Sequence, residues 1–269
     1  MMPPCIEMEK GVSAMGQKES RVYGKKIDIR PDEVQAFYDK RARSMAEREE
    51  AYTTVLLGDQ DPSAARRWDT YEKAFILPKL RLTPEKRVLD IGCGMGRWAE
   101  TVAPLCGDYV GVDFSADMIR YDEQHFAAPP FDRCTFCNLS FEQAMQAEAV
   151  TSQKYDAVII TGVSMYINDD ALRTCYEGLA KLLAPGAIVY IEESAAVRER
   201  LSLDHIWSEA LKDDYAAIYR TREEYQELLA PLLAVCDVIE DDYMHAVDKE
   251  EYTETTHWYT ILQFRGAAV

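Results

Sequence analysis

Residues 88–98 read VLDIGCGMGRW, an apolar run that contains one acid and leads into three glycines at every second position. The apolar residues are typical of a parallel strand that is buried on both faces, where polar alternation disappears. The glycines let the backbone turn sharply and approach a ligand closely, because no side chain fills the space. They are Gly92, Gly94 and Gly96. We therefore expect a strand, a glycine turn and a helix whose free N–H groups face the turn.

A second apolar run, YVGVDFS at 109–115, places Asp113 21 residues after Gly92. A carboxylate at the end of the neighbouring strand accepts both hydroxyls of a ribose. The glycine spacing discriminates between cofactors, because a dinucleotide fingerprint is G-x-G-x-x-G. Here the third glycine comes one residue early and the bulky Arg97 follows it. The pattern predicts a site for an adenosine-containing cofactor and disfavours a pyrophosphate.

These motifs resemble those of the class I S-adenosylmethionine-dependent methyltransferases, in which a strand ends D/E-x-G-x-G-x-G and the next strand ends in an acid. KYDAVIITGVSMYI (154–167) is similar to the family's fourth strand, and LLAPGAIVYIEES (182–194) to its fifth. The resemblance implies that S-adenosylmethionine lies with its methionine end against the glycine turn. It also implies that Asp90 lies near the amino group of the cofactor and that Asp113 holds the ribose.

Further cofactor contacts are implied by the same resemblance. Asn138 and Leu139 follow the third strand, where the family places a loop beside the adenine, although Asn138 is equally a strand-ending turn residue. Phe114 packs either against the adenine or in the core, and Tyr38 either folds over the cofactor or packs between helices. Open α/β sheets bind ligands where their strands end, and the residues after the fourth strand are Thr161, Gly162 and Tyr166.

Three residues are candidates for handling a proton during methyl transfer. The protein must hold the acceptor in line behind the methyl group, and an acceptor hydroxyl also needs a base. Glu192 and Glu193 end the fifth strand, and we select Glu193, which alternatively caps the following helix. His205 and His245 are the histidines nearest the predicted acceptor side, although a histidine is also a common packing residue.

Composition restricts the partners. Lys and Arg number 30 against 47 Asp and Glu, a net charge of −17, which is a poor match for nucleic acid or an anionic membrane. We expect a small-molecule acceptor; the sequence says nothing of the oligomeric state. The seven scattered cysteines, with neither a secretory leader nor a membrane-length apolar run, favour a cytoplasmic protein. We expect no metal site, because Cys134 and Cys137 point to opposite faces of a strand.

The alternation of strands and helices predicts an α/β fold: a doubly wound, mostly parallel seven-stranded sheet of the Rossmann-like methyltransferase type, with a C-terminal antiparallel hairpin and a helical cap. The predicted strands are 87–91, 109–113, 134–138, 155–161, 187–193, 233–240 and 257–264. The predicted units are a flexible tail (1–30), an N-terminal helical cap (31–80), and a core (81–269) with a helical insertion over the acceptor site (195–232).

The leading functional hypothesis is S-adenosylmethionine-dependent methyl transfer to an oxygen or nitrogen of a polar small molecule, by in-line displacement in a closed pocket. One alternative is a nicotinamide-dependent oxidoreductase on a related sheet; the chain lacks a Tyr-x-x-x-Lys after the fourth strand. Another is a non-catalytic protein that binds S-adenosylmethionine.

Overall fold

The computed structural model describes residues 21–56, 61–209, 211–244 and 254–266. Its main sheet has the strand order β4-β3-β2-β5-β6-β10-β9. The strands are β2 (Arg87–Ile91), β3 (Asp108–Asp113), β4 (Cys134–Asn138), β5 (Tyr155–Thr161), β6 (Leu183–Ala196), β9 (Cys236–Tyr243) and β10 (Thr255–Phe264). The first five strands in this order are parallel, and β10 runs antiparallel to both neighbours. The predicted doubly wound sheet with its C-terminal hairpin is confirmed.

Successive residues of the central strands pack on opposite faces of the sheet. Val88 belongs to one apolar cluster and Leu89 to the other, and the same alternation separates Ile159 from Ile160. Because both faces are covered, these strands read as continuous apolar runs. Cys134 and Cys137 likewise pack against different clusters, as their spacing predicts.

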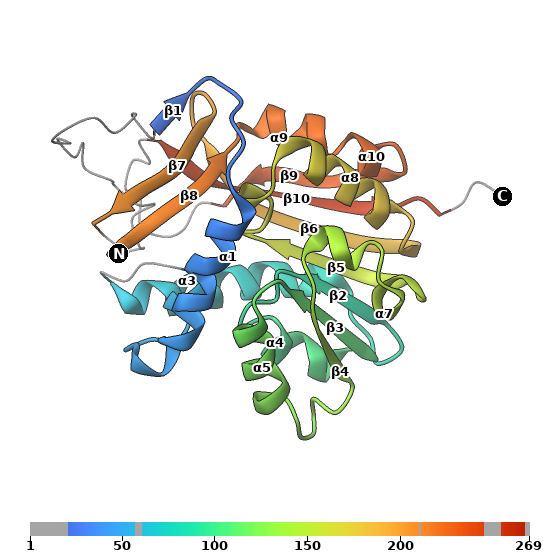
Figure 1. The fold of residues 1–269 in the computed structure, drawn as a ribbon. Helices are drawn as coiled ribbons and strands as arrows, with labels where there is room; N and C mark the ends of the chain where they lie inside the picture. The colour runs from blue at the N-terminus through green and yellow to red at the C-terminus, as the bar shows by residue number, and fades with distance from the viewer. Residues whose placement is uncertain (1–20, 57–60, 210, 245–253, 267–269) are drawn as a thin grey trace, which may run out of the picture.

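Helices cover both faces of the sheet (Figure 1). One face packs against α3 (Pro62–Ile76), η2 (Leu77–Leu80), α4 (Ala99–Val102) and η3 (Ala103–Leu105). The other packs against α6 (Phe141–Ala144), α7 (Glu148–Thr151), α8 (Asp169–Ala180), α9 (Arg222–Leu228) and α10 (Ala230–Leu233). Helix α5 (Ala116–His125) contacts β3 and β4. The remaining helices are α1 (Pro31–Arg43), η1 (Met45–Glu47), α2 (Thr53–Leu56) and η4 (Ser164–Tyr166).

A second sheet of three strands lies beside α1 at one end of the main sheet (Figure 1). It consists of β1 (Arg21–Tyr23), β7 (Leu201–Ser208) and β8 (Asp213–Tyr219), all antiparallel. The predicted helical insertion is therefore wrong over 201–219 and right only from Thr221, where a capping box opens α9. The predicted tail is also wrong at β1, whereas residues 1–20 lie outside the described part of the chain.

The error has a physical cause. The register of β7 with β8 shifts between Leu203 and Ile206, and His205 there has φ +53°. A bulge of this kind breaks the two-residue alternation by which a strand is predicted from sequence. The partner strand β1 lies about 180 residues earlier in the chain, so no pattern in the local sequence predicts this pairing.

Candidate functional site

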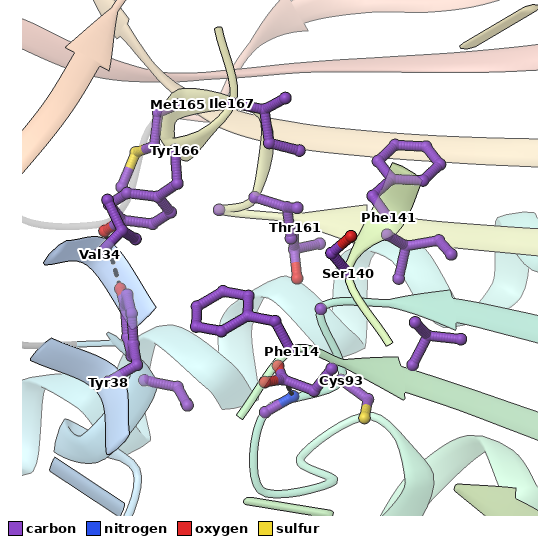
Figure 2. A pocket seen from close by; sticks show the side chains of 18 of the residues that line it. Val34, Tyr38, Cys93, Phe114, Ser140, Phe141, Thr161, Met165, Tyr166 and Ile167 are labelled. Atoms are coloured by element: carbon purple, nitrogen blue, oxygen red, sulfur yellow. Dashed lines mark hydrogen bonds between the residues drawn. The ribbon is translucent and has the colours of Figure 1, made fainter. Parts of the chain in front are cut away.

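A cavity of about 290 Å³ opens where β2, β3, β5 and β6 end, between the main sheet, α1 and the three-stranded sheet. This is the edge at which open parallel sheets bind ligands. Figure 2 shows side chains of α1, of η4 and of the ends of β2, β3 and β5 around the cavity. Of the predicted cofactor residues, the following line it: Tyr38, Gly92, Gly94, Asp113, Phe114, Leu139, Thr161, Gly162 and Tyr166. Three others, Asp90, Gly96 and Asn138, do not.

The glycine turn has the backbone that its sequence predicts. Gly92 has φ +74°, and a Cβ built on it would lie 2.2 Å from Cγ2 of Val163, which packs directly on the turn. Gly96 has φ +72°, and its Cβ would lie 2.2 Å from the ring of Phe126, which packs the turn against the core. Only glycine fits both the conformation and the space at these positions. Gly92 and Gly94 are the glycines of the turn that line the cavity.

Asp113 ends β3 with its carboxylate at the cavity. Its Oδ2 accepts the backbone N–H of Gly94 at 3.0 Å, and its Oδ1 accepts that of Ser115 at 2.8 Å. Burial raises the pKa of Asp113 to about 6, and the two backbone donors oppose that rise. Each carboxylate oxygen has further lone pairs, so this group can accept the two hydroxyls of a ribose.

Two predicted cofactor residues, Asp90 and Asn138, lie next to the residues that line the cavity without lining it themselves. Asp90 is 1% exposed and accepts the hydroxyl of Tyr109, and burial raises its pKa to about 7. The Asn138 amide donates to the backbone carbonyls of Asp113 and Phe114 at 3.1 and 2.9 Å. Asn138 thus fixes the end of β3, in keeping with its interpretation as a turn residue. Leu139 is the member of this loop that reaches the cavity.

Four tyrosine hydroxyls form a chain along the cavity wall that faces the three-stranded sheet. Tyr38 of α1 donates to Tyr166 of η4 at 2.7 Å, and Tyr166 and Tyr215 share a hydrogen bond of 2.7 Å (Figure 2 shows the first pair). Tyr219 donates to Tyr215 at 3.3 Å. Burial raises the pKa of Tyr38 to about 12 and raises the pKa of Tyr166 and Tyr215 well above the usual value, so these three hydroxyls stay neutral. The chain connects α1, η4 and β8 across the site.

The predicted catalytic residues lie away from the cavity or outside the described residues. Glu193 is fully buried, and its carboxylate accepts the backbone N–H groups of η4, at 2.7 Å from Ser164 and 3.1 Å from Val163. Burial raises its pKa to about 7. His205 lies on the bulge of β7 with a half-exposed ring 3.3 Å from Glu33, and it does not line the cavity. His245 lies outside the described residues.

A carboxylate–imidazole pair that the sequence analysis did not select does line the cavity. Nδ1 of His257 lies 2.8 Å from Oε1 of Glu192, and the ring of Trp68 stacks on the imidazole with centroids 4.0 Å apart. Glu192 lies near the end of β6 at the edge of the cavity, and His257 lies near the start of the antiparallel β10 at the same edge. The predicted hairpin is the signal that could have found this pair, because it returns the chain beside the end of the fifth parallel strand.

Arg97, which follows the glycine turn, is the centre of a buried ion cluster. Its guanidinium donates to Glu72 at 2.7 Å, to Asp69 at 3.1 Å and to the Thr161 hydroxyl at 3.0 Å. Burial lowers the pKa of Arg97, but the two carboxylates outweigh burial and the net shift is upward. Arg97 therefore joins α3 to the cavity floor as a permanent cation.

A family model described as a methyltransferase domain matches residues 82–266. The chain belongs to this family. Two curated relatives of this methyltransferase domain are a phosphoethanolamine N-methyltransferase of Triticum aestivum, 26% identical over 132 residues, and a ubiquinone biosynthesis O-methyltransferase of Albidiferax ferrireducens, 25% identical over 169 residues. The matches cover 49% and 60% of this chain, and 26% and 61% of the relatives. The chain thus spans about a quarter of the wheat enzyme's length.

Solved structures share the fold of the methyltransferase domain. A Haemonchus contortus phosphoethanolamine N-methyltransferase in complex with phosphoethanolamine and S-adenosylhomocysteine has a TM-score of 0.61 at 18% identity, over 89% of this chain and 50% of that one. An S-adenosylmethionine-dependent methyltransferase of Leishmania major has a TM-score of 0.59 at 15% identity, over 93% and 100%. The predicted fold and family are confirmed, and S-adenosylmethionine is the cofactor that the family supports.

Two predicted absences concern metals and membranes. Within the described ranges, no group of three or more His, Cys, Asp or Glu side chains is arranged to hold a metal ion. No helix in the described part of the chain is long and apolar enough to cross a bilayer. The cytoplasmic location stays a prediction.

Proposed function

We propose that this chain transfers a methyl group from S-adenosylmethionine to an oxygen or nitrogen of a polar small molecule. The observation that carries the proposal is the glycine turn hydrogen-bonded to the Asp113 carboxylate at one end of a cavity, whose far wall holds the tyrosine hydroxyls and the Glu192–His257 pair. Bare backbone and a buried carboxylate fit an adenosine-containing molecule, and a Cβ at Gly92 would collide with Val163, which also lines the cavity.

The residues divide the work by position. Asp113 would hold the ribose, while Phe114 and Leu139 flank the space beside it for the adenine. When bound, the cofactor supplies a methyl group that its sulfonium already activates. The protein's task is to exclude water and to hold the acceptor atom in line, which converts a bimolecular step into a local one. Tyr38 and Tyr166 close the cavity from the side of α1 and η4.

The net charge of the chain favours a small-molecule acceptor over RNA. One curated relative, 27% identical over 124 residues, is a ribosomal RNA uracil methyltransferase of Vibrio cholerae. A chain of net charge −17 is a poor electrostatic match for RNA, whose binding depends on neutralising phosphates. A cavity of about 290 Å³ at the sheet edge suits a molecule of metabolite size.

Two measurements on the purified protein test the proposal. Calorimetry should detect S-adenosylhomocysteine binding in the micromolar range and no binding of NAD⁺. Incubation with methyl-labelled S-adenosylmethionine and a metabolite extract should then label a small molecule. Binding of NAD⁺ alone would favour the oxidoreductase alternative. Binding of S-adenosylhomocysteine with no label in any fraction would favour a non-catalytic protein, and labelled RNA or protein would contradict the acceptor class.

A further inference from the structure

The charges that line the cavity are unbalanced at the end away from Asp113. Among the described lining residues, Arg97 is the one permanently charged cation. Its guanidinium is bound by two carboxylates, Glu72 at 2.7 Å and Asp69 at 3.1 Å, and Lys73 lies 2.8 Å from the second of these. Two cations and two anions therefore neutralise one another in this cluster. No positive charge in it remains for an anionic acceptor.

Outside this cluster, Glu192 and His257 form a second pair of ionisable groups in the cavity lining. Glu192 is 5% exposed, and its Oε1 lies 2.8 Å from Nδ1 of the imidazole. The three-stranded sheet meets the main sheet beside this pair, because the backbone N–H of Ala196 donates to the carbonyl of Arg220 and Thr255 pairs with Ala196. Tyr219 ends β8 next to Arg220, and the tyrosine chain and the carboxylate–imidazole pair line the same cavity.

The tyrosine chain adds acceptors and aromatic surface to this negative end. Three hydrogen bonds join four hydroxyls, so three of the four protons are used within the chain. Hydroxyl oxygens keep lone pairs that accept N–H groups, and the faces of Tyr and Trp rings attract cations. Trp68, stacked on His257, presents such a ring at the same end.

From this arrangement we infer that the methyl acceptor is a primary or secondary amine without a carboxylate or phosphate beside it. Glu192 and the tyrosine chain hold the amine, and His257 accepts its proton. The inference rests on the proposed function and narrows it to nitrogen. A cationic amine is drawn to an acidic cavity, whereas an anion would lie against Glu192 with no compensating charge.

The reaction balances with these groups. The ammonium form of the acceptor first gives one proton to His257, whose Nε2 is basic when Nδ1–H donates to Glu192. The nitrogen lone pair then forms the new N–C bond as the C–S bond breaks, and the electron pair of that bond passes to sulfur. The positive charge moves from sulfur to the methylated nitrogen, beside the carboxylate of Glu192. In this scheme Glu192 is a positioning residue for the imidazole and for the amine.

The direct test compares probes of one shape and different charge. Calorimetry on the full-length protein saturated with S-adenosylhomocysteine would use two sets: ethanolamine, ethylene glycol and glycolate, then benzylamine, benzyl alcohol and benzoate. We expect the amine to bind at least tenfold more tightly than its partners in at least one set and an anion to bind best in neither. Equal binding within both sets, or a preference for an anion, would overturn the inference. Failure of S-adenosylhomocysteine to bind would instead overturn the proposed function.

Variants assign the effect to the two residues. Glu192→Gln should abolish the amine preference and leave S-adenosylhomocysteine affinity within about twofold, whereas Glu177→Gln, the same change on the exposed side of α8, should alter neither. His257→Gln should lower kcat for the tightest-binding amine at least a hundredfold with KM within about fivefold. A retained amine preference in Glu192→Gln, or an unchanged kcat in His257→Gln, would contradict the role given to that residue.

Discussion

The two halves of the cavity are built in different ways. The half that holds Asp113 comes from one continuous segment, β2 through β3, in which the glycine turn and the carboxylate lie within 92–115 and contact each other directly. The opposite half is assembled from α1, η4, β8 and β10, so that Tyr38 and Tyr166 are separated by 128 residues and Glu192 and His257 by 65. One half is a local motif and the other a meeting of distant segments.

The difference separates the two functions of the site. A local motif keeps its geometry wherever the strand and turn fold, which suits a cofactor shared by a whole family. An assembled wall can change its residues one element at a time, which suits acceptors that differ between relatives. We therefore expect substitutions in the local half to weaken cofactor binding, and substitutions in the assembled half to lower stability or acceptor recognition.

The largest effect should come from Arg220, which holds the assembled half together. It is fully buried and donates to the carbonyls of Ser164 and Ile167 and to Asp169. Replacing a buried, paired charge costs about 3 to 5 kcal/mol of unfolding free energy. We expect Arg220→Met to lose that much in urea unfolding followed by circular dichroism. Arg173→Met, at an exposed position of α8, should stay within about 0.5 kcal/mol of the parent; an equal loss in both would refute the role of Arg220.

Asp113 tests the local half. Its carboxylate is the predicted acceptor for two ribose hydroxyls, and a hydrogen bond to a charged group contributes about 1.5 to 3 kcal/mol. We expect Asp113→Ala to weaken S-adenosylhomocysteine about a hundredfold in calorimetry. Asp132→Asn, on the exposed loop before β4, serves as the control and should bind as the parent does. Unchanged affinity in Asp113→Ala would place the ribose elsewhere.

Alanine substitutions at two glycines distinguish backbone strain from loss of the cofactor site. Gly92 and Gly186 have φ +74° and +77°, but an added Cβ meets Val163 at 2.2 Å in the first and only Gln263 at 4.0 Å in the second. Both alanine variants should lose about 1 to 2 kcal/mol of stability from the left-handed backbone. Only Gly92→Ala should also lose cofactor affinity. Val163→Ala in the same chain should restore part of that affinity, and no recovery would point to another cause.

The smallest effect concerns the pH dependence of stability and Asp122, a buried residue of α5 beside the glycine turn. Burial, followed by the charge of Asp113, raises the pKa of Asp122 from 3.8 to about 9. A raised folded-state pKa of an acid means that the native state binds the extra proton, so its stabilisation is complete below pH 3.8 and is lost as pH rises towards 9. We expect Asp122→Asn to gain stability relative to the parent across this window, and the gain should be larger at pH 8 than at pH 5.

The control for that titration has the opposite sign. A hydrogen bond from Arg120, followed by one from Arg43, lowers the pKa of the half-buried Asp117 below 3.8, although burial opposes them. Its stabilisation is present above pH 3.8 and lost as pH falls further. Asp117→Asn should therefore melt slightly below the parent at neutral pH and converge with it in acid. If the Tm difference for Asp122→Asn has the same sign and pH dependence as for Asp117→Asn, burial is not what governs Asp122.

The sequence predicted the local half closely and the assembled half poorly. Predicted strand 87–91 is β2, and 109–113 differs from β3 by one residue, because buried runs and turn glycines are local signals. The hairpin of β9 and β10 was also predicted, but its consequence, His257 beside Glu192, was not. The strands β7 and β8 were predicted as helix, since their partner β1 is remote and a bulge interrupts their alternation.

The central claim is that the glycine turn and Asp113 seat the nucleoside while the tyrosine chain, Glu192 and His257 face the acceptor. A crystal structure of the complex with S-adenosylhomocysteine tests it most directly. The account predicts the ribose on the Asp113 carboxylate and the sulfur facing the space before Glu192 and Tyr166. A nucleoside bound in the reverse orientation, or outside this cavity, would contradict it.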